Sequence, residues 1–173
     1  YFLIMDNITP IDGRYKTLTD PLKSLFTEYA FIKERVIIEI KYFLFLLKLN
    51  NDVFPDNDKL CIFMENLSNN ISFQHIDSIK VIENKIHHDV KSIEYFLTKQ
   101  LLDNNFHKYI NLLHFGLTSQ DVNTMAYSIS LHKFKNNIFI PLFDTLLSNI
   151  QNKIDIWNNT VIIGRTHGQP ATW

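Results

Sequence analysis

A long run of apolar residues spaced three and four apart limits the fold of this chain more than any other feature. The run consists of Leu22, Leu25, Phe26, Tyr29, Ile32, Val36, Ile40 and Phe43. This spacing places all of them on one face of a helix. Asp20 before Pro21 predicts where the helix begins, and the Asn50–Asn51 pair predicts where it ends. A helix of this kind packs along a bundle, so the sequence predicts an all-α protein.

Weaker patterns of the same kind predict the remaining elements. Helices are expected over residues 59–69, 73–86, 89–102 and from 118 to about 157, with a helical turn at 107–113. Asp89 is the predicted cap of the helix that follows it. Pro141 predicts a break or bend in the last helix. Residues 161–163 should be extended, and residues 164–170 should form an irregular loop.

Charge and hydropathy exclude several classes of partner. The formal net charge is −1, with acids and bases scattered along the chain, so neither nucleic acid nor an anionic membrane surface is an expected partner. The longest apolar run, residues 42–47, is far shorter than the roughly 20 residues that cross a bilayer. Cys61 is the only cysteine, which suits a reducing compartment and predicts a cytoplasmic protein.

Two short polar segments in the first half of the chain are candidates for binding. In residues 12–15, Arg14 and Tyr15 follow a glycine, and a guanidinium group suits phosphate. An exposed arginine beside a core tyrosine is the alternative. In residues 87–89, adjacent histidines point in different directions, which disfavours a shared metal ion. His88 could bind a carboxylate or phosphate near the helix start, or it could be a surface histidine beside a plain capping residue.

Two further segments lie in the second half of the chain. Thr118 and Ser119 place two hydroxyls at a predicted helix N-terminus, which suits a carboxylate, although the spacing of Thr118 and Asp121 also fits a capping box without a ligand. His167 lies between two glycines and can transfer protons near neutral pH. A turn histidine bonded to backbone is the alternative for His167.

Together and in order, these segments resemble the adenylosuccinate lyases of the fumarase/aspartase superfamily. The matching stretches are Pro10-Ile11-Asp12-Gly13-Arg14-Tyr15, His88-Asp89-Val90-Lys91, Thr118-Ser119-Gln120-Asp121 and Arg165-Thr166-His167-Gly168-Gln169-Pro170-Ala171-Thr172. The family cleaves adenylosuccinate to AMP and fumarate, and succinylaminoimidazole carboxamide ribotide (SAICAR) to AICAR and fumarate, in purine nucleotide biosynthesis. It uses no metal and no cofactor.

The resemblance also implies a role for each candidate residue. Arg14 and Tyr15 would hold the nucleotide phosphate, and Thr118 with Ser119 would bind a succinyl carboxylate. His167 matches the general acid of the family. His88, with His87 and Asp89, would shape the substrate pocket and support catalysis. Relatives often have Asn at the position of His87.

The resemblance further implies that this chain is an amino-terminal fragment. Residues 1–110 would form the first helical domain, and residues 111–173 would begin a central helical bundle that forms a homotetramer. The serine loop that supplies the family's general base has no counterpart here, so the fragment alone is expected to be inactive. Two alternatives remain open: another superfamily lyase such as argininosuccinate lyase, or a non-catalytic fragment for oligomerisation or nucleotide binding.

Overall fold

The computed structural model describes residue 9 and residues 11–171. Pro10 and Thr172, both part of the predicted motifs, lie outside this part of the chain. The chain separates into two compact units, one ending at Phe134 and the other beginning at Lys135, and each is considered by itself. The domain boundary expected near residue 110 from the sequence remains a prediction.

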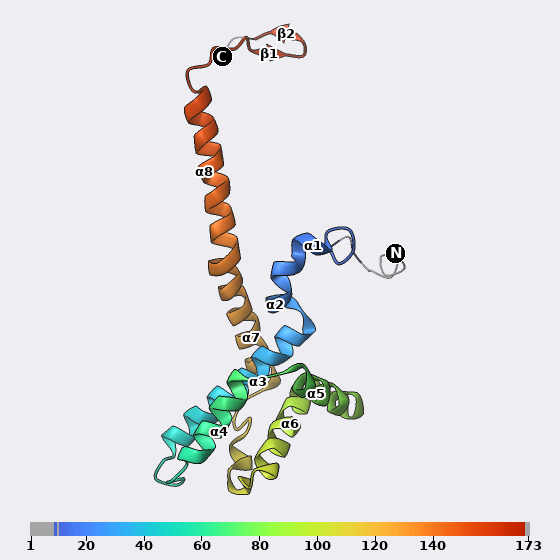
Figure 1. The fold of residues 1–173 in the computed structure, drawn as a ribbon, viewed down its shortest axis with the longest axis vertical. Coiled ribbons are helices and arrows are strands. Elements are labelled where there is room, and N and C mark those ends of the chain that lie inside the picture. Colours follow the sequence, from blue (N-terminus) through green and yellow to red (C-terminus); the bar gives the residue numbers. More distant parts are fainter. Residues whose placement is uncertain (1–8, 10, 172–173) are drawn as a thin grey trace. The chain divides into compact units, whose positions relative to one another are not determined.

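The first unit is built from helices, as the sequence predicted (Figure 1). Its elements are α1 (Lys16–Thr19), η2 (Asp20–Leu22), α2 (Lys23–Phe26), α3 (Glu28–Leu49), α4 (Asp58–Asn69), α5 (Phe73–Ile86), α6 (Asp89–Asp103), η3 (His107–Leu112) and α7 (Ser119–Phe134). Helix α3 contacts α2, α4, α5, α6, η3 and α7. It is therefore the central element around which the unit assembles.

The prediction of one uninterrupted helix from Asp20 to Asn50 is wrong, because the chain breaks at Thr27. This residue has extended backbone angles, with φ −78° and ψ 158°, and caps α3. Its hydroxyl accepts a hydrogen bond from Ala30 N and donates one to the carbonyl of Lys23. A threonine can thus end one helix and begin the next while the apolar spacing continues through the break.

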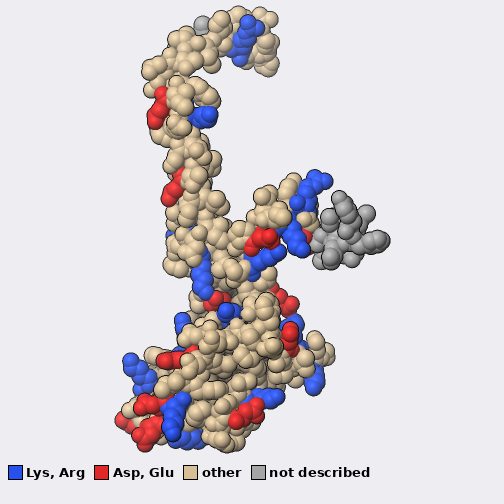
Figure 2. Space-filling model, in the orientation of Figure 1, with Lys and Arg blue, Asp and Glu red and all other residues tan. Residues whose placement is uncertain are grey.

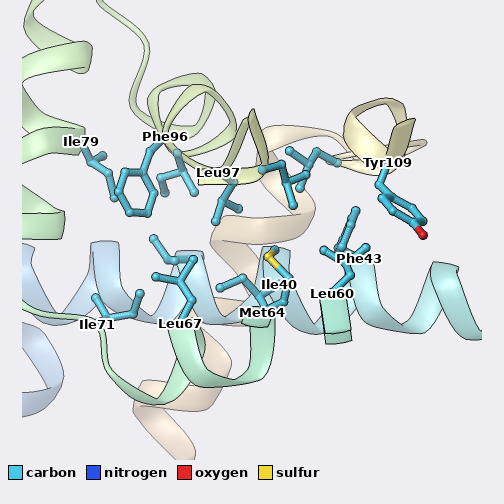
Figure 3. Packing of buried hydrophobic residues seen from close by; sticks show 14 of the residues in the cluster. Ile40, Phe43, Leu60, Met64, Leu67, Ile71, Ile79, Phe96, Leu97 and Tyr109 are labelled. Atoms are coloured by element: carbon cyan, nitrogen blue, oxygen red, sulfur yellow. The ribbon is translucent and has the colours of Figure 1, made fainter. Parts of the chain in front are cut away.

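The core lies around α3 and is almost entirely aliphatic and aromatic. Figure 3 shows Leu60 and Met64 of α4 and Leu97 of α6 meeting Ile40 and Phe43 of α3, and all five side chains are fully buried. Burying one such side chain stabilises a fold by roughly 1.5 to 3 kcal/mol. This core fixes α3 relative to α6, and so it determines where the polar side chains of α3 point.

The junction between α5 and α6 differs from the prediction in one detail. His87 ends α5 in the left-handed conformation, with φ 53°, and His88 is the N-cap of α6. The cap is made by Nδ1 of His88, which accepts a hydrogen bond from Lys91 N at 3.1 Å. Asp89, the predicted cap, is instead the first helical residue. At this position the positive end of the helix dipole stabilises its carboxylate.

The second unit consists of a π-helical turn η4 (Lys135–Phe139), helix α8 (Ile140–Trp157) and a two-stranded hairpin. The predicted break near Pro141 is confirmed, because η4 replaces regular α-helix just before this proline, which lies in the first turn of α8. No residue of α8 is buried within the unit. None of the described helices is long and apolar enough to cross a membrane.

The prediction of an irregular loop over residues 164–170 is wrong. Strand β1 (Arg165–Thr166) pairs antiparallel with β2 (Gln169–Pro170), and His167 and Gly168 form the turn between them. Both turn residues have positive φ, 49° and 79°, which a two-residue hairpin turn of type I′ requires. The glycine adopts this conformation without cost, and the histidine tolerates it better than most residues.

Candidate functional site

Charged residues of α3 hold two of the predicted segments in place. Arg35 and Glu39 are the two charged residues of this helix that are buried, and they lie one turn apart. Arg35 binds the segment at the start of α6, and Glu39 binds the segment before α7. Buried charges are rare unless they are paired. Through these two residues, α3 connects the segment at the start of α6 with the segment before α7, which the sequence analysis treated as separate candidates.

Asp89 is held by Arg35. Its Oδ2 lies 2.8 Å from a guanidinium nitrogen of Arg35, whose side chain is only 9% exposed. The guanidinium group also lies over the ring of Phe31, 4.0 Å from its centroid. Burial alone would raise the pKa of Asp89, but a hydrogen bond from the Val90 backbone and the charge of Arg35 outweigh it and lower this pKa. Asp89 is thus a fixed carboxylate.

His87 and His88 are both exposed beside this ion pair. Nδ1 of His88 is occupied as a cap acceptor, and it lies 3.8 Å from Oδ1 of Asp89. Since Nδ1 accepts, Nε2 carries the proton of the neutral ring and can donate it to a ligand. Among the described residues, no group of three or more metal-ligating side chains is found here or elsewhere.

The segment that leads into α7 is tied to α3 at two points. Nδ1 of His114 lies 2.5 Å from Oε1 of Glu39, and the Tyr42 hydroxyl donates to the carbonyl of Phe115 at 2.9 Å. Burial raises the pKa of Glu39, although the hydrogen bond and charge of His114 oppose this effect. His114 and Gly116 both have positive φ, so the chain turns sharply before it enters α7.

Thr118 and Ser119 stand at the start of α7, as predicted, but Asp121 occupies the donors of Thr118. Its Oδ2 accepts from the backbone N–H of Thr118 at 2.8 Å and from the hydroxyl at 2.9 Å. These bonds, the backbone bond first, lower the pKa of Asp121. Ser119 is half-buried, and its hydroxyl has no hydrogen-bond partner in the described part of the chain. Ser119 is therefore the hydroxyl that is free for a ligand.

Arg14 and Tyr15 lie in a turn just before α1, and both are exposed. Bonds within the segment shape this turn: Gly13 N donates to the carbonyl of Thr9, and Lys16 N donates to the carbonyl of Gly13. The Thr19 hydroxyl bonds the Ile11 carbonyl. The segment is thus locally ordered, with the guanidinium group of Arg14 open to a ligand.

His167 is exposed at the tip of the hairpin in the second unit. The hairpin is closed at its base by a 2.7 Å bond from Ala171 N to the carbonyl of Gly164. A Cβ atom added at Gly164 would lie 3.0 Å from the carbonyl oxygen of Ala171, so a larger residue at this position would crowd the closure. The hairpin thus presents an imidazole on a short, defined turn.

A pocket of about 550 Å³ lies in the first unit among α3, the end of α4 and α7. Apolar and polar side chains both line it, and the polar ones include Lys41, Tyr42 and Asp121. None of the predicted site residues lines it. Figure 2 shows Lys and Arg mixed with Asp and Glu over the visible face of this unit, which agrees with the charge balance of the sequence.

Arg35 and Glu39 are the residues that sequence reasoning missed. The sequence did contain a sign of their role, because these two opposite charges lie four residues apart beside the apolar face of the predicted long helix. Such a pair also fits an exposed i,i+4 ion pair. The structure instead shows that each binds a distant segment: Arg35 binds Asp89, and Glu39 binds His114.

Comparison with known proteins gives a consistent result. The sequence profile of a family described as lyase matches residues 13–172. An adenylosuccinate lyase from Buchnera aphidicola is 38% identical over 168 residues, which are 95% of this chain and 36% of that protein. The adenylosuccinate lyase of Dictyostelium discoideum is 36% identical, and that of Haemophilus influenzae is 30% identical, with 95% of this chain and 37% of each protein covered. The chain spans little more than a third of the length of these relatives.

Proposed function

Since the chain belongs to the lyase family, we propose that it is the amino-terminal part of an adenylosuccinate lyase, a carbon–nitrogen lyase that releases fumarate. Its substrates would be adenylosuccinate, cleaved to AMP and fumarate, and SAICAR, cleaved to AICAR and fumarate. The observation that carries this proposal is the identity of 30 to 38% with adenylosuccinate lyases along nearly the whole chain. The candidate residues of the four polar segments, from Arg14 to His167, all lie within residues 13–172, which the family profile matches.

The proposed reaction is a β-elimination. A base removes a proton from the succinyl carbon next to the one that bears nitrogen, the electron pair forms the double bond of fumarate, and the C–N bond breaks. The departing nitrogen takes a proton from an acid. Nothing is oxidised or reduced, so the reaction requires acid–base groups and anion-binding groups but no redox cofactor.

Two groups of residues in the first unit would bind the anionic parts of the substrate. The guanidinium of Arg14 can bind a phosphate through paired hydrogen bonds, with Tyr15 beside it. Ser119 and the backbone N–H groups at the start of α7 suit a succinyl carboxylate. Thr118 would join them after exchanging its bonds to Asp121. A carboxylate at this point gains from the helix dipole but must avoid the charge of Asp121.

The segment of His87, His88 and Asp89 would shape the wall of the pocket. Its capping bond leaves Nε2 of His88 as a donor toward substrate, and the ion pair with Arg35 keeps Asp89 charged. An exposed imidazole with a fixed ring suits hydrogen bonding to a phosphate, a carboxylate or the purine.

His167 would be the general acid. An amine leaves poorly unless its nitrogen is protonated as the bond breaks, and a positioned acid contributes roughly 10² to 10⁴-fold. The hairpin turn supports this role because it exposes the ring while both of its strands are held by backbone hydrogen bonds. The general base would come from a part of the enzyme beyond this chain.

The active protein would be a cytoplasmic homotetramer. Helix α8 supports the association of several chains, since its apolar side chains are all about half exposed or more: Leu142, Leu146, Leu147, Ile150 and Ile154. In Figure 2 most of the surface of α8 carries neither acids nor bases. An apolar helix of this kind requires other helices to cover it.

The proposal is tested by His167→Gln in the full-length protein. Glutamine fills a similar volume but cannot donate a proton as an acid. We expect kcat to fall by about 10² to 10⁴-fold while KM stays within severalfold. His107→Gln is the matched control, because His107 is also exposed and begins η3 outside the site, and it should leave kcat unchanged. Near-normal turnover by His167→Gln would remove His167 as the acid.

A further inference from the structure

Two side chains of α3 hold the segment that enters α7. Glu39 binds His114 at 2.5 Å, and the Tyr42 hydroxyl donates to the Phe115 carbonyl at 2.9 Å. We infer that Glu39 is a positioning residue that, with Tyr42, keeps residues 114–118 in the turn that presents the start of α7 to the substrate carboxylate. This inference rests on the proposed function, because it concerns the same carboxylate site.

The burial of Glu39 is costly for the fold and so calls for an explanation. Its side chain is 1% exposed, and burial raises its pKa. Glu94 adds a like charge nearby, although Lys91 binds Glu94 at 2.7 Å. Apolar residues in place of both Glu39 and His114 would pack without that cost, since a buried ion pair is often replaceable by apolar groups with no loss of stability. The packing of the core alone therefore does not require this pair.

The contact with His114 is specific in its geometry. A carboxylate can only accept hydrogen bonds, so with Glu39 ionised the proton must reside on Nδ1 of His114. This bond fixes the plane of the ring and the position of its backbone. The side chain of His114 is 18% exposed, so most of the ring is enclosed together with Glu39.

The segment itself needs to be held, because its backbone is not in a favoured conformation. His114 has φ 55° and Gly116 has φ 73°, and the left-handed region is disfavoured for a residue that carries a Cβ atom. The Leu117 backbone N–H donates to the His114 carbonyl at 3.2 Å and closes the turn. Thr118 and Ser119 follow immediately, so any relaxation of the turn displaces them.

Tyr42 gives the second hold on the turn. Its hydroxyl oxygen would lie 4.0 Å from a Cβ atom added at Gly116, so the phenol lies directly over this glycine. Glu39 and Tyr42 are three residues apart, on adjacent turns of the same helix. Residues of this helix are part of the buried core, and the turn is therefore attached to the central helix of the unit.

The test uses the full-length protein with Glu39→Gln, Tyr42→Phe and the control Glu34→Gln. Glu34 is on the same helix and also binds a cation of α7, Lys133, and its carboxylate forms no hydrogen bond or ion pair with residues 114–118 among the described contacts. Two binding constants are measured: inhibition by fumarate, which reports the carboxylate site, and the affinity of AMP by calorimetry. Hydrogen exchange of peptides that cover residues 114–121 reports the turn without any need for activity.

We expect Glu39→Gln to weaken fumarate inhibition by about tenfold, to leave the affinity of AMP within about twofold, and to speed exchange in residues 114–121. Tyr42→Phe should do the same to a smaller degree, and it keeps the inference testable if Glu39→Gln does not fold. Glu34→Gln should change none of the three. Unchanged fumarate inhibition and exchange in Glu39→Gln, or equal losses in Glu34→Gln, would overturn the inference.

Failure of the proposed function looks different. A wild-type protein that neither cleaves adenylosuccinate nor binds fumarate would refute the proposed function. The exchange contrast between Glu39→Gln and Glu34→Gln would still decide whether Glu39 holds the turn.

Discussion

The ion pair between Arg35 and Asp89 allows the sharpest test of how the fold supports the site. Arg35→Met removes the charge from a side chain that is 9% exposed, and Asp89→Asn removes its partner. The single variants mix several effects, because Arg35 also stacks on Phe31, and its Nε has no hydrogen-bond partner among the described residues. A double-mutant cycle separates the pair from these effects.

The size of the coupling follows from the exposure of the two side chains. A hydrogen bond to a charged group contributes roughly 1.5 to 3 kcal/mol, and a fully exposed ion pair contributes about 0.2 to 1 kcal/mol. Arg35 is nearly buried, but the Asp89 side chain is 45% exposed, so water screens one half of the pair. We therefore expect a coupling free energy of about 1 to 2 kcal/mol at neutral pH.

The coupling should also depend on pH in a defined direction. The folded state lowers the pKa of Asp89 below its usual value of 3.8, so folding favours the charged form. The corresponding stability is fully present above pH 3.8, and it is lost as the pH falls through the lower folded value. Repeating the cycle at pH values stepped below 3.8 should therefore shrink the coupling.

The assay is urea unfolding of the four proteins of the cycle. The pair of Glu28 and Lys80 is the matched control, since its atoms approach to 2.6 Å but its side chains are 70% and 33% exposed. Its coupling should be about 0.5 kcal/mol or less. A coupling for Arg35 and Asp89 no larger than that of the control would show that burial does not strengthen this pair.

Three other outcomes are expected. Arg14→Ala in the full-length enzyme should mainly raise KM for adenylosuccinate, because loss of a charged phosphate contact costs about 1.5 to 3 kcal/mol. If calorimetry shows an unchanged affinity for AMP, Arg14 does not bind the phosphate. Thr27→Ala should destabilise the protein by about 1 kcal/mol, since the cap of α3 is lost, whereas Thr27→Ser should not. A protein of these 173 residues should self-associate in sedimentation, because α8 exposes apolar side chains. The double variant Leu146→Gln and Ile150→Gln should associate less, and unchanged association would show that α8 is not the association surface.

Much of the helical framework was predictable because it depends on local patterns. Helix α5 has the predicted bounds, and α4 and α6 differ from their predictions by one residue at an end. Apolar spacing and stop residues such as the Asn50–Asn51 pair act within a few residues of the chain, so a sequence displays them directly. The break at Thr27 was missed because the apolar spacing continues across it.

The candidate site was less predictable because its contacts span the chain. The sequence shows His88, Asp89 and Ser119 as unusual residues, but it does not show that α3 holds their segments. The contact between Glu39 and His114 joins residues 75 positions apart. The hairpin around His167 was also missed, since its strands have only two residues each, too few for an alternating pattern to appear. The roles of these residues in binding and catalysis stay predictions.

The most direct measurement is product formation by the full-length protein supplied separately with adenylosuccinate and with argininosuccinate. Fumarate and AMP are quantified together by chromatography, with His167→Gln as the inactive reference. We predict that adenylosuccinate yields fumarate and AMP in equal amounts, that argininosuccinate yields no fumarate, and that the variant is slower by about 10² to 10⁴-fold. Fumarate from argininosuccinate alone, or from neither substrate, would contradict the assignment of this chain to an adenylosuccinate lyase.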